Sequence, residues 1–309
     1  MTVLTPPAGG TAAPRTSASP QDRRTPRRPK KLLSNLFLIG LVVYFALPLW
    51  WLLVASTKDT AGLFASPHGA LWFADGFHLV DNLRSLFAYD NGIYLRWMGN
   101  SFLYALAGGI GSTVLAVLAG YGFAKFDFRG RNLTFSVLLG AVMVPATALV
   151  IPTFVLLSRM ELTNTVWAVI LPSLLNPFGV YLMRVYASEG VPDEILDAAR
   201  VDGAGTFRTF FQVALPLLRP AIVTVLLLSV VATWNNYFLP LAMLSDSRLF
   251  PVTVGIGLLQ GLAGANNGGG ESLWMLIVVG SLVSIVPLVI AFLSLQKYWQ
   301  GGLAIGSLK

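Results

Sequence analysis

The sequence predicts an all-α integral membrane protein with six transmembrane helices. Of its 309 residues, 55% are hydrophobic and only 11% are charged, and the mean hydropathy is +0.70. This balance lies far outside that of soluble domains. Six long apolar stretches lack Asp, Glu, Lys and Arg, and each reaches the ~20 residues that a helix needs to cross ~30 Å of hydrocarbon. Because the stretches are continuous rather than alternating, helices are favoured over a β-barrel.

The first apolar stretch, at about residues 35–56, follows a basic tail and suits either a secretory signal or a retained span. It is longer than a usual signal-peptide core, and no convincing small-residue cleavage site precedes Lys58, so we expect a retained signal anchor. The tail, residues 1–31, carries seven basic residues among Pro, Ser and Thr, which predicts disorder. We therefore divide the chain into this tail and a six-span domain, residues 32–309.

The other predicted spans alternate with loops of unequal charge. These spans lie at about residues 100–124, 133–157, 163–182, 221–241 and 272–296. Sixteen of the 21 Lys and Arg residues fall in the tail, in the loops after the second and fourth spans, and at the C-terminal end. By the positive-inside bias, both termini are expected in the cytoplasm. The net charge of +7 then faces anionic membrane lipid, and no module for binding nucleic acid accompanies it.

The residues that the sequence lacks exclude several kinds of chemistry. It has no cysteine, which excludes disulfides, thiol redox chemistry and cysteine-ligated metals. His68 and His78 have no carboxylate cluster nearby in the sequence, so we expect ordinary solvated side chains and no metal site. Motifs for nucleotide hydrolysis, zinc proteolysis and serine hydrolysis do not occur. We therefore expect a chain that is no enzyme and holds no cofactor.

Four function classes remain for a membrane protein of this kind. The predicted spans hold no ionisable residue, which argues against a carrier that binds protons or sodium through carboxylates. Backbone carbonyls can also bind sodium, so an autonomous channel or ion-coupled secondary carrier stays open. The others are a membrane scaffold and a transporter half that receives its energy from a partner.

One predicted cytoplasmic loop interrupts the apolar composition with charge. Residues 193–202 hold five ionisable side chains. Pro192 suits the first position of a short helix, and Asp193 and Glu194 complement the positive end of its dipole. A narrow apolar face on this helix is formed by Ile195, Ala198 and Ala199.

A glycine stop and a second short helix are predicted next. Gly203 can take a positive φ without the penalty of about 1 kcal/mol that a residue with Cβ suffers. Thr206 is expected to cap the second helix, which ends near Leu215 and Pro216. Its apolar residues recur at i, i+3, i+4 and i+7: Phe207, Phe210, Phe211 and Ala214. By amphipathicity alone, the favoured interpretation is that the two helices lie on the bilayer surface or pack under their own bundle.

This loop resembles a known family motif. The stretch VPDEILDAARVDGAGTFRTFFQVALPLLRPAI resembles the EAA loop of ABC importer permease subunits, with matching positions at Ala198, Ala199, Asp202, Gly203, Ala204, Phe210, Leu215 and Pro216. From residue 32 onward the chain is most similar to carbohydrate-importer permeases of the maltose-transporter G-subunit type. Stretches that carry this similarity include NSFLYALAGGIGSTVLAVLAGYGFAKFDFRGR and WNNYFLPL. The resemblance implies the type I ABC importer permease fold.

For function, the resemblance implies a permease subunit of an ATP-driven, binding-protein-dependent sugar importer in the cytoplasmic (inner) membrane of a prokaryote. Its expected partners are a second, homologous but non-identical permease, two ATP-binding cassette subunits that hold ATP and Mg²⁺, and an extracytoplasmic sugar-binding protein. The loop at residues 184–219 would present a coupling helix to the ATPase. The residues implied in that contact are Asp197, Ala198, Ala199, Asp202, Gly203, Ala204, Phe207, Phe210 and Phe211. Asp197 departs from the glutamate of the motif, and its side chain reaches about one methylene less far.

Two other groups of residues are candidates for solute and partner contacts. Asn235 and Asn236 lie past the middle of the fifth predicted span, where an amide facing lipid is unfavourable. We expect them to bond between helices, with sugar contact in a translocation path as the alternative. The neighbouring Trp234 suits either a sugar-stacking position or an interfacial anchor.

The predicted outer loops offer a second partner surface. We expect a short helix capped by Asp81 in the first outer loop. In the last outer loop, a glycine-rich segment suits a mobile connection, and the resemblance implies docking of the binding protein there. Its candidate residues are Gly268, Gly269 and Gly270.

Overall fold

The computed structural model describes residues 30–65, 69–74, 76–265 and 273–303, and every regular element within these ranges is a helix. The all-α prediction is therefore confirmed. Up to residue 190, the α-helices are α1 (Lys30–Ser56), α2 (Thr60–Ala65), α3 (Leu79–Ala88), α4 (Ile93–Lys125), α5 (Arg131–Val142), α6 (Val150–Arg159), α7 (Trp167–Ser173) and α8 (Pro177–Gly190). Those that follow are α9 (Asp193–Val201), α10 (Thr206–Thr209), α11 (Leu215–Leu217), α12 (Arg219–Trp234), α13 (Phe238–Met243), α14 (Val252–Ala265) and α15 (Leu273–Leu303).

Two compact units meet inside α1, one ending at Leu47 and the other beginning at Pro48. Proline inside a helix removes a backbone hydrogen bond and favours a kink. The boundary predicted at residue 31, between the basic tail and the six-span domain, does not coincide with this division and stays a prediction. Apart from the span formed by α1, the features described below belong to the second unit.

The described helices provide four to six membrane spans. Four continuous stretches are long and apolar enough to cross a bilayer, and two bent helix pairs raise the number to six if each pair is one span. One bent pair joins α5 to α6 at 99°, so the predicted span at residues 133–157 is wrong as a straight helix. Pro145 lies at this break with ψ 126°, outside the helical range, and proline cannot continue the hydrogen-bond ladder.

Two further predicted span boundaries also differ from the structure. The helix predicted at residues 221–241 ends at Trp234, because the backbone breaks before α13 begins. The helix predicted at residues 163–182 continues to Gly190 and so includes Arg184 and Glu189. Charged residues near the end of a span can reach the headgroup region, and a search for uncharged stretches ends too early at such positions.

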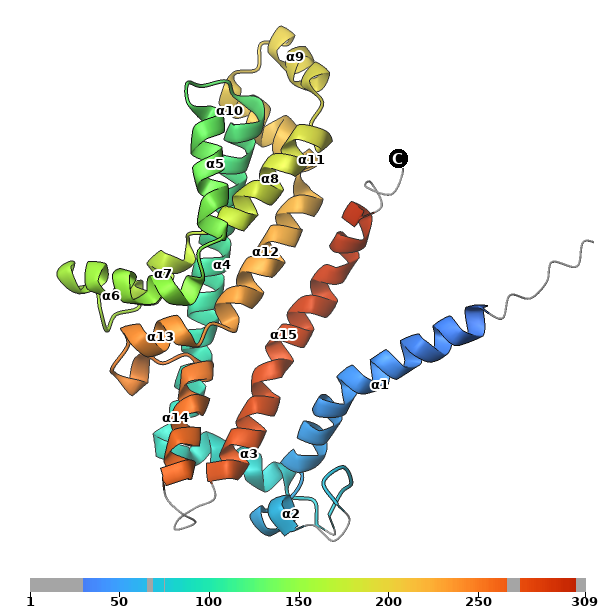
Figure 1. The fold of residues 1–309 in the computed structure, drawn as a ribbon, viewed down its shortest axis with the longest axis vertical. Helices are drawn as coiled ribbons and strands as arrows, with labels where there is room; N and C mark the ends of the chain where they lie inside the picture. Colours follow the sequence, from blue (N-terminus) through green and yellow to red (C-terminus); the bar gives the residue numbers. More distant parts are fainter. Residues whose placement is uncertain (1–29, 66–68, 75, 266–272, 304–309) are drawn as a thin grey trace, which may run out of the picture. The chain divides into compact units, whose positions relative to one another are not determined.

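Helix α4 lies at the centre of the second unit, where it packs along α8 and α12 (Figure 1). Glycines make this packing close. A Cβ atom at Gly109 would lie 2.6 Å from Cγ2 of Val230 on α12, and one at Gly120 would lie 2.5 Å from Cβ of Met183 on α8. Small residues at helix contacts allow backbones to approach in a membrane, where dispersion contacts stabilise association. The three helices therefore form the rigid frame of the unit.

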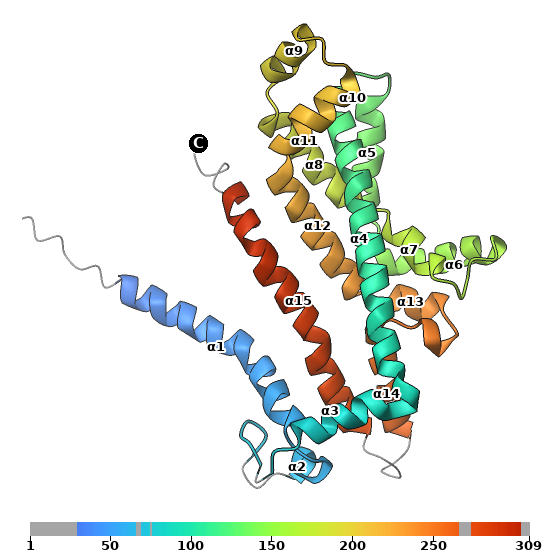
Figure 2. The same cartoon turned by 180° about the vertical axis from the view of Figure 1, so that it is seen from behind.

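Two buried clusters of apolar side chains lie toward opposite ends of α4. One contains Trp97 and Tyr104 and joins α4 to α14 and α15. The other contains Tyr121 and also takes in Leu196 and Phe210 from the segment between α8 and α12. Figures 1 and 2 show α9 to α11 at the end of α4 opposite to α3 and α14. The segment at residues 191–218, called the α8–α12 loop below, is thus part of the folded core.

Candidate functional site

The first helix of the α8–α12 loop is α9, and its local signals agree with the sequence. Its first turn is acidic, as predicted. Pro192 is the N-cap with ψ 139°, one position before the predicted one, because its extended backbone cannot belong to the helix. Leu196 is 3% exposed and faces the core, whereas Ile195 on the predicted apolar face is 42% exposed. The predicted face of α9 therefore points away from the bundle.

A glycine-dependent cap ends α9, as the sequence predicts. Gly203 has φ +79°, its N–H donates to the carbonyl of Arg200 at 3.0 Å, and the N–H of Ala204 donates to the carbonyl of Ala199 at 2.9 Å. This pair of bonds is the Schellman motif. No atom lies within 4 Å of the place that a Cβ at Gly203 would occupy. Backbone conformation, and not lack of space, is what favours glycine here.

The second helix of the loop runs over Thr206–Leu217 and bends by 77° into α12. The predicted cap at Thr206 is wrong, because Gly205 occupies the N-cap position and no side chain bonds to this helix end. Residues Phe210–Ala214 form a π-helical turn. The members of the predicted apolar stripe do not share one environment. Phe210 is 7% exposed, whereas Phe207 is 81% and Phe211 57% exposed.

Two contacts fasten the α8–α12 loop to the last turns of α4. Nζ of Lys125 lies 2.7 Å from Oδ1 of Asp193, and the lysine side chain is only 7% exposed. The hydrogen bond from Lys125 holds the pKa of the Asp193 carboxyl below its usual value. The rings of Tyr121 and Phe210 pack with their centroids 4.9 Å apart. Each helix of the loop therefore has its own contact with α4.

Four large apolar side chains between residues 195 and 211 of this loop remain exposed. We call them the exposed face: Ile195, Val201, Phe207 and Phe211. Val201 is 87% exposed, and the nearby Asp197 and Arg200 are joined by an ion pair of 2.6 Å. Exposed apolar patches beside charged residues mark contact surfaces for partners. Among the nine predicted coupling residues, only Phe210 is buried.

The candidate path residues lie where α12 ends. Trp234 is 5% exposed and packs edge-on against Phe102, with ring centroids 5.1 Å apart. Asn235 is exposed. Oδ1 of Asn236 accepts from the N–H of Leu239 at 3.4 Å, so this amide supports the break before α13. Their predicted roles in solute passage stay predictions.

A partly buried polar link between the start of α8 and α12 was missed by the sequence analysis. Nδ2 of Asn176 donates to Oγ of Ser229 at 2.9 Å, and Oδ1 of Asn176 accepts from the N–H of Gly179 at the start of α8. Asn before Pro at a helix start was the available signal. The partner residue, 53 positions away, has no signal in the sequence.

The opposite end of α4 holds a second connection, residues 244–252, which we call the strap. Side chains of α4 bond directly to its backbone: Nε1 of Trp97 donates to Ser247 at 2.8 Å, and the hydroxyl of Tyr104 donates to Leu249 at 2.8 Å. Oγ of Ser101 accepts from the N–H of Val252 at 2.8 Å. The sequence analysis missed this fastening, which joins residues about 150 positions apart.

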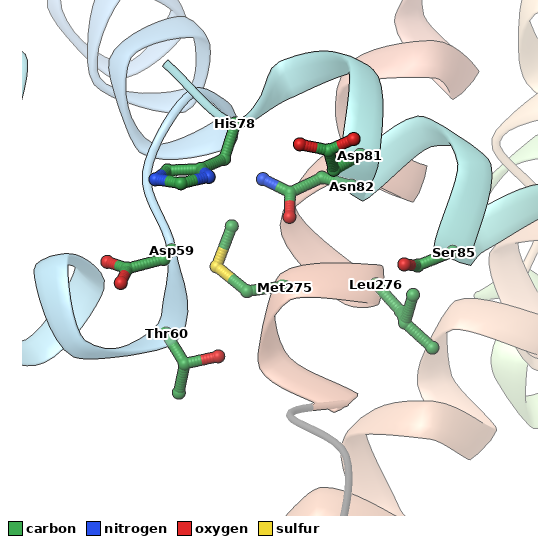
Figure 3. A pocket seen from close by; sticks show the side chains of 8 residues that line it. All are labelled: Asp59, Thr60, His78, Asp81, Asn82, Ser85, Met275 and Leu276. Carbon is green, nitrogen blue, oxygen red and sulfur yellow. The ribbon is translucent and has the colours of Figure 1, made fainter. Parts of the chain in front are cut away.

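A small pocket lies between α3 and the start of α15, toward the end of α4 that bonds to the strap. It encloses about 260 Å³, and Figure 3 shows the side chains that line it: Asp59, Thr60, His78, Asp81, Asn82, Ser85, Met275 and Leu276. The predicted helix α3 is confirmed, but His78 is its N-cap, and Asp81 lies inside its first turn. No group of three or more His, Asp or Glu side chains able to hold a metal occurs in the described ranges.

The predicted docking residues Gly268, Gly269 and Gly270 lie outside the described residues, as does His68. Nothing in the structure tests these predictions. The described part of the last outer loop ends at Ala265, the C-terminal residue of α14.

Known proteins share both the sequence and the fold. Residues 112–301 match the family model described as binding-protein-dependent transport system inner membrane component. The arabinooligosaccharides transport system permease protein AraQ of Halalkalibacterium halodurans is 33% identical over 92% of this chain and 99% of its own length. The sn-glycerol-3-phosphate transport system permease protein UgpE of Pectobacterium atrosepticum is 28% identical over 90% of this chain and 97% of its own.

One solved structure supports the fold. A chain of a bacterial ABC transporter involved in the import of the acidic polysaccharide alginate superposes with a TM-score of 0.74 at 22% identity. The match covers 92% of this chain and 100% of that chain. The two chains thus share a fold along nearly their whole length.

Proposed function

Because the chain belongs to the family of binding-protein-dependent transport system inner membrane components, we propose that it forms half of the translocation pathway of an ATP-driven sugar importer. A second, homologous but non-identical permease subunit supplies the other half. An extracytoplasmic binding protein delivers the sugar, and both termini of the chain face the cytoplasm. The excess of Lys and Arg in the tail and in the loops after the second and fourth predicted spans supports this orientation.

The substrate class rests on the relatives. AraQ is named for arabinooligosaccharides and matches at 33% identity along nearly the whole chain, whereas UgpE is named for sn-glycerol-3-phosphate and matches at 28%. Family membership alone therefore does not fix the solute. The higher identity to AraQ favours a carbohydrate, and an oligosaccharide is the first solute to test.

The observation that carries the proposal is the exposed face of the α8–α12 loop. Four apolar side chains remain exposed around a rigid Gly203 cap, on a loop whose own core residues are buried. Leaving such side chains in water is unfavourable by about 25 cal/mol for each Å² that a partner would cover. Two ATP-binding cassette subunits, one on each permease, hold ATP and Mg²⁺ and perform the hydrolysis. We assign the exposed face of this chain to contact with one of them.

The remaining candidate residues have roles in the same proposal. Asn235, exposed at the end of α12, and its neighbours Trp234 and Asn236 belong to the translocation path. The glycines at 268–270 contact the binding protein. Shortening that glycine segment should lower uptake that depends on the binding protein, and unchanged uptake would remove this part of the proposal.

Affinity purification of the detergent-solubilised chain tests the partner assignment. Wild type is compared with a variant that changes only the exposed face, Val201→Ser with Phe207→Ala, and the partners are identified by mass spectrometry. Recovery of a second permease and an ATPase with wild type, and selective loss of the ATPase with the variant, is expected.

Phe77→Ala is the matched control for this purification. Phe77 is 66% exposed and immediately precedes His78 of the pocket at the strap end, so its substitution removes a similar ring from the other end of the unit. This control should retain the ATPase. A wild-type chain that purifies alone, and that carries solute in liposomes without any ATPase, would replace the proposal by an autonomous channel or carrier.

A further inference from the structure

The ion pair between Lys125 and Asp193 joins two helix ends of opposite polarity. Lys125 is the last residue of α4, and Asp193 is the first residue of α9. A cation at a helix C-terminus and an anion at a helix N-terminus each interact favourably with the local dipole. The pair therefore fixes the C-terminal end of α4 to the N-terminal end of α9, which carries two of the four residues of the exposed face.

The burial of Lys125 makes this pair different from an ordinary surface ion pair. The lysine side chain is 7% exposed, whereas Asp193 is 78% exposed. A buried ammonium group that loses its partner is strongly unfavourable, while two exposed charges separate at little cost. Lys125 is thus held toward the loop, and movement of α9 away from α4 would leave the ammonium without its carboxylate.

A second contact supports the ion pair one helical turn earlier. Tyr121 packs on Phe210 of the second loop helix with ring centroids 4.9 Å apart. Tyr121 also contacts Phe126, just beyond the end of α4, at 5.9 Å. Since both loop helices touch α4, a rigid displacement of the loop cannot leave α4 in place without breaking one of these contacts.

Close packing transmits a displacement of α4 to the neighbouring helix α8. Next to Tyr121, the backbone of Gly120 approaches Met183 and Arg184 of α8 so closely that a Cβ would lie 2.8 Å from the Arg184 nitrogen. Well-packed contacts of this kind transmit displacement rather than absorb it. Helix α4 is also the helix that runs from the loop to the strap.

We propose that the Lys125–Asp193 ion pair, supported by the Tyr121–Phe210 contact, is a positioning element that transfers the movement of the α8–α12 loop to α4. This inference rests on the proposed function, because a partner ATPase is what moves the loop. Chain connectivity alone would move α8 and α12, which flank the loop. The ion pair adds a direct connection from the loop to α4, besides the packing of α4 on α8 and α12.

The test measures solute imported per ATP hydrolysed in proteoliposomes that hold the complete importer. Lys125→Ala and Asp193→Ala should each lower this ratio about threefold or more, the size of a modest coupling free energy. The ATPase should still co-purify, because the exposed face is intact. Asp193→Glu keeps a carboxylate at the start of α9 and should retain at least half of the wild-type ratio, which separates loss of the charge from a mere change of the side chain.

Asp127→Ala is the matched control for this experiment. It breaks the 2.6 Å ion pair between Asp127 and Arg131, which lies just past the end of α4 but does not touch the α8–α12 loop. The ratio should stay at the wild-type value in this variant.

The possible outcomes separate the two proposals. If Lys125→Ala and Asp193→Ala both keep the wild-type ratio, or if Asp127→Ala lowers it equally, the positioning role of the ion pair is wrong while the importer assignment stands. If wild type captures no ATPase and imports no solute with one, the proposed function fails, and the positioning role fails with it.

Discussion

The two ends of α4 hold their connecting segments in different ways. At one end, side chains of α4 bond to the backbone of the strap through Trp97, Ser101 and Tyr104. At the other end, an ion pair, a ring contact and buried apolar side chains hold the α8–α12 loop, and large apolar side chains stay exposed. The strap is completed within the chain, whereas the loop is built around contacts that the chain itself does not make. The difference separates a structural connection from a surface for a partner.

The largest effect is expected where the strap is fastened. Trp97 is 2% exposed and donates to the Ser247 carbonyl, so Trp97→Ala leaves a cavity and removes this hydrogen bond. We expect a loss of about 3–5 kcal/mol in the free energy of unfolding, as for other buried tryptophans. A thermal unfolding scan of the purified protein measures this loss. Trp72→Ala, at a tryptophan that is 62% exposed, should stay close to wild type, and equal destabilisation of both variants would contradict the account of the strap.

The next effect separates two phenylalanines of the α8–α12 loop. Phe207→Ala should weaken capture of the ATPase about tenfold or more, because exposed aromatic side chains dominate many interfaces, and should leave thermal stability unchanged. Phe210→Ala should lower thermal stability, because its ring packs on Tyr121. The affinity for the ATPase and the unfolding temperature are measured for each variant, and together they distinguish the exposed ring from the buried one. A stability loss at Phe207 that equals the loss at Phe210 would show that the exposed face is wrongly assigned.

A smaller effect is expected at the cap of α9. Gly203→Ala places a Cβ at φ +79°, which is unfavourable by about 1–2 kcal/mol although the space is open. Gly203→Asn should recover part of this loss, since asparagine tolerates the left-handed region. Gly203→Asp should lower sugar uptake while membrane insertion stays intact. Uptake assays compare the three variants with wild type. Identical uptake by all four proteins would exclude a role for the cap.

The smallest effect concerns pH at the ion pair. The hydrogen bond and charge of Lys125, with Arg200 nearby, lower the pKa of Asp193, whose carboxylate also faces Tyr121. A lowered pKa in the folded state means that the contribution of the pair is complete above the usual Asp range and is lost only as pH falls through the lowered value. Solute imported per ATP should therefore not change through this pair between about pH 8 and about pH 5. A fall of the ratio near pH 6 that Asp193→Ala removes would contradict this.

Sequence reasoning found the elements whose causes are local. Uncharged stretches of membrane length located the spans, and a glycine after an acidic helix located the Gly203 cap. The bend at Pro145 was missed because an uncharged run does not reveal where a helix breaks. The proline itself was the available signal.

The parts that could not be predicted depend on contacts between distant residues. Phe207 is exposed, whereas Phe210 is buried and packs on Tyr121, although the helical repeat alone places the two on one face. Lys125 and Asp193 are 68 residues apart, and neither has a local signal for the other. The strap joins residues about 150 positions apart, so only the folded chain shows it.

Thiol labelling tests the central claim most directly, because the chain has no cysteine and a single one can be introduced. Phe207→Cys and Phe77→Cys place a thiol at an exposed position of each end. In inside-out membrane vesicles, a membrane-impermeant maleimide should modify position 207 only when the ATPase is stripped away. Position 77 should react only in right-side-out membranes. Modification of position 207 that is unaffected by the ATPase, or that occurs from the same side as position 77, would contradict the assignment of the exposed face to a cytoplasmic ATPase.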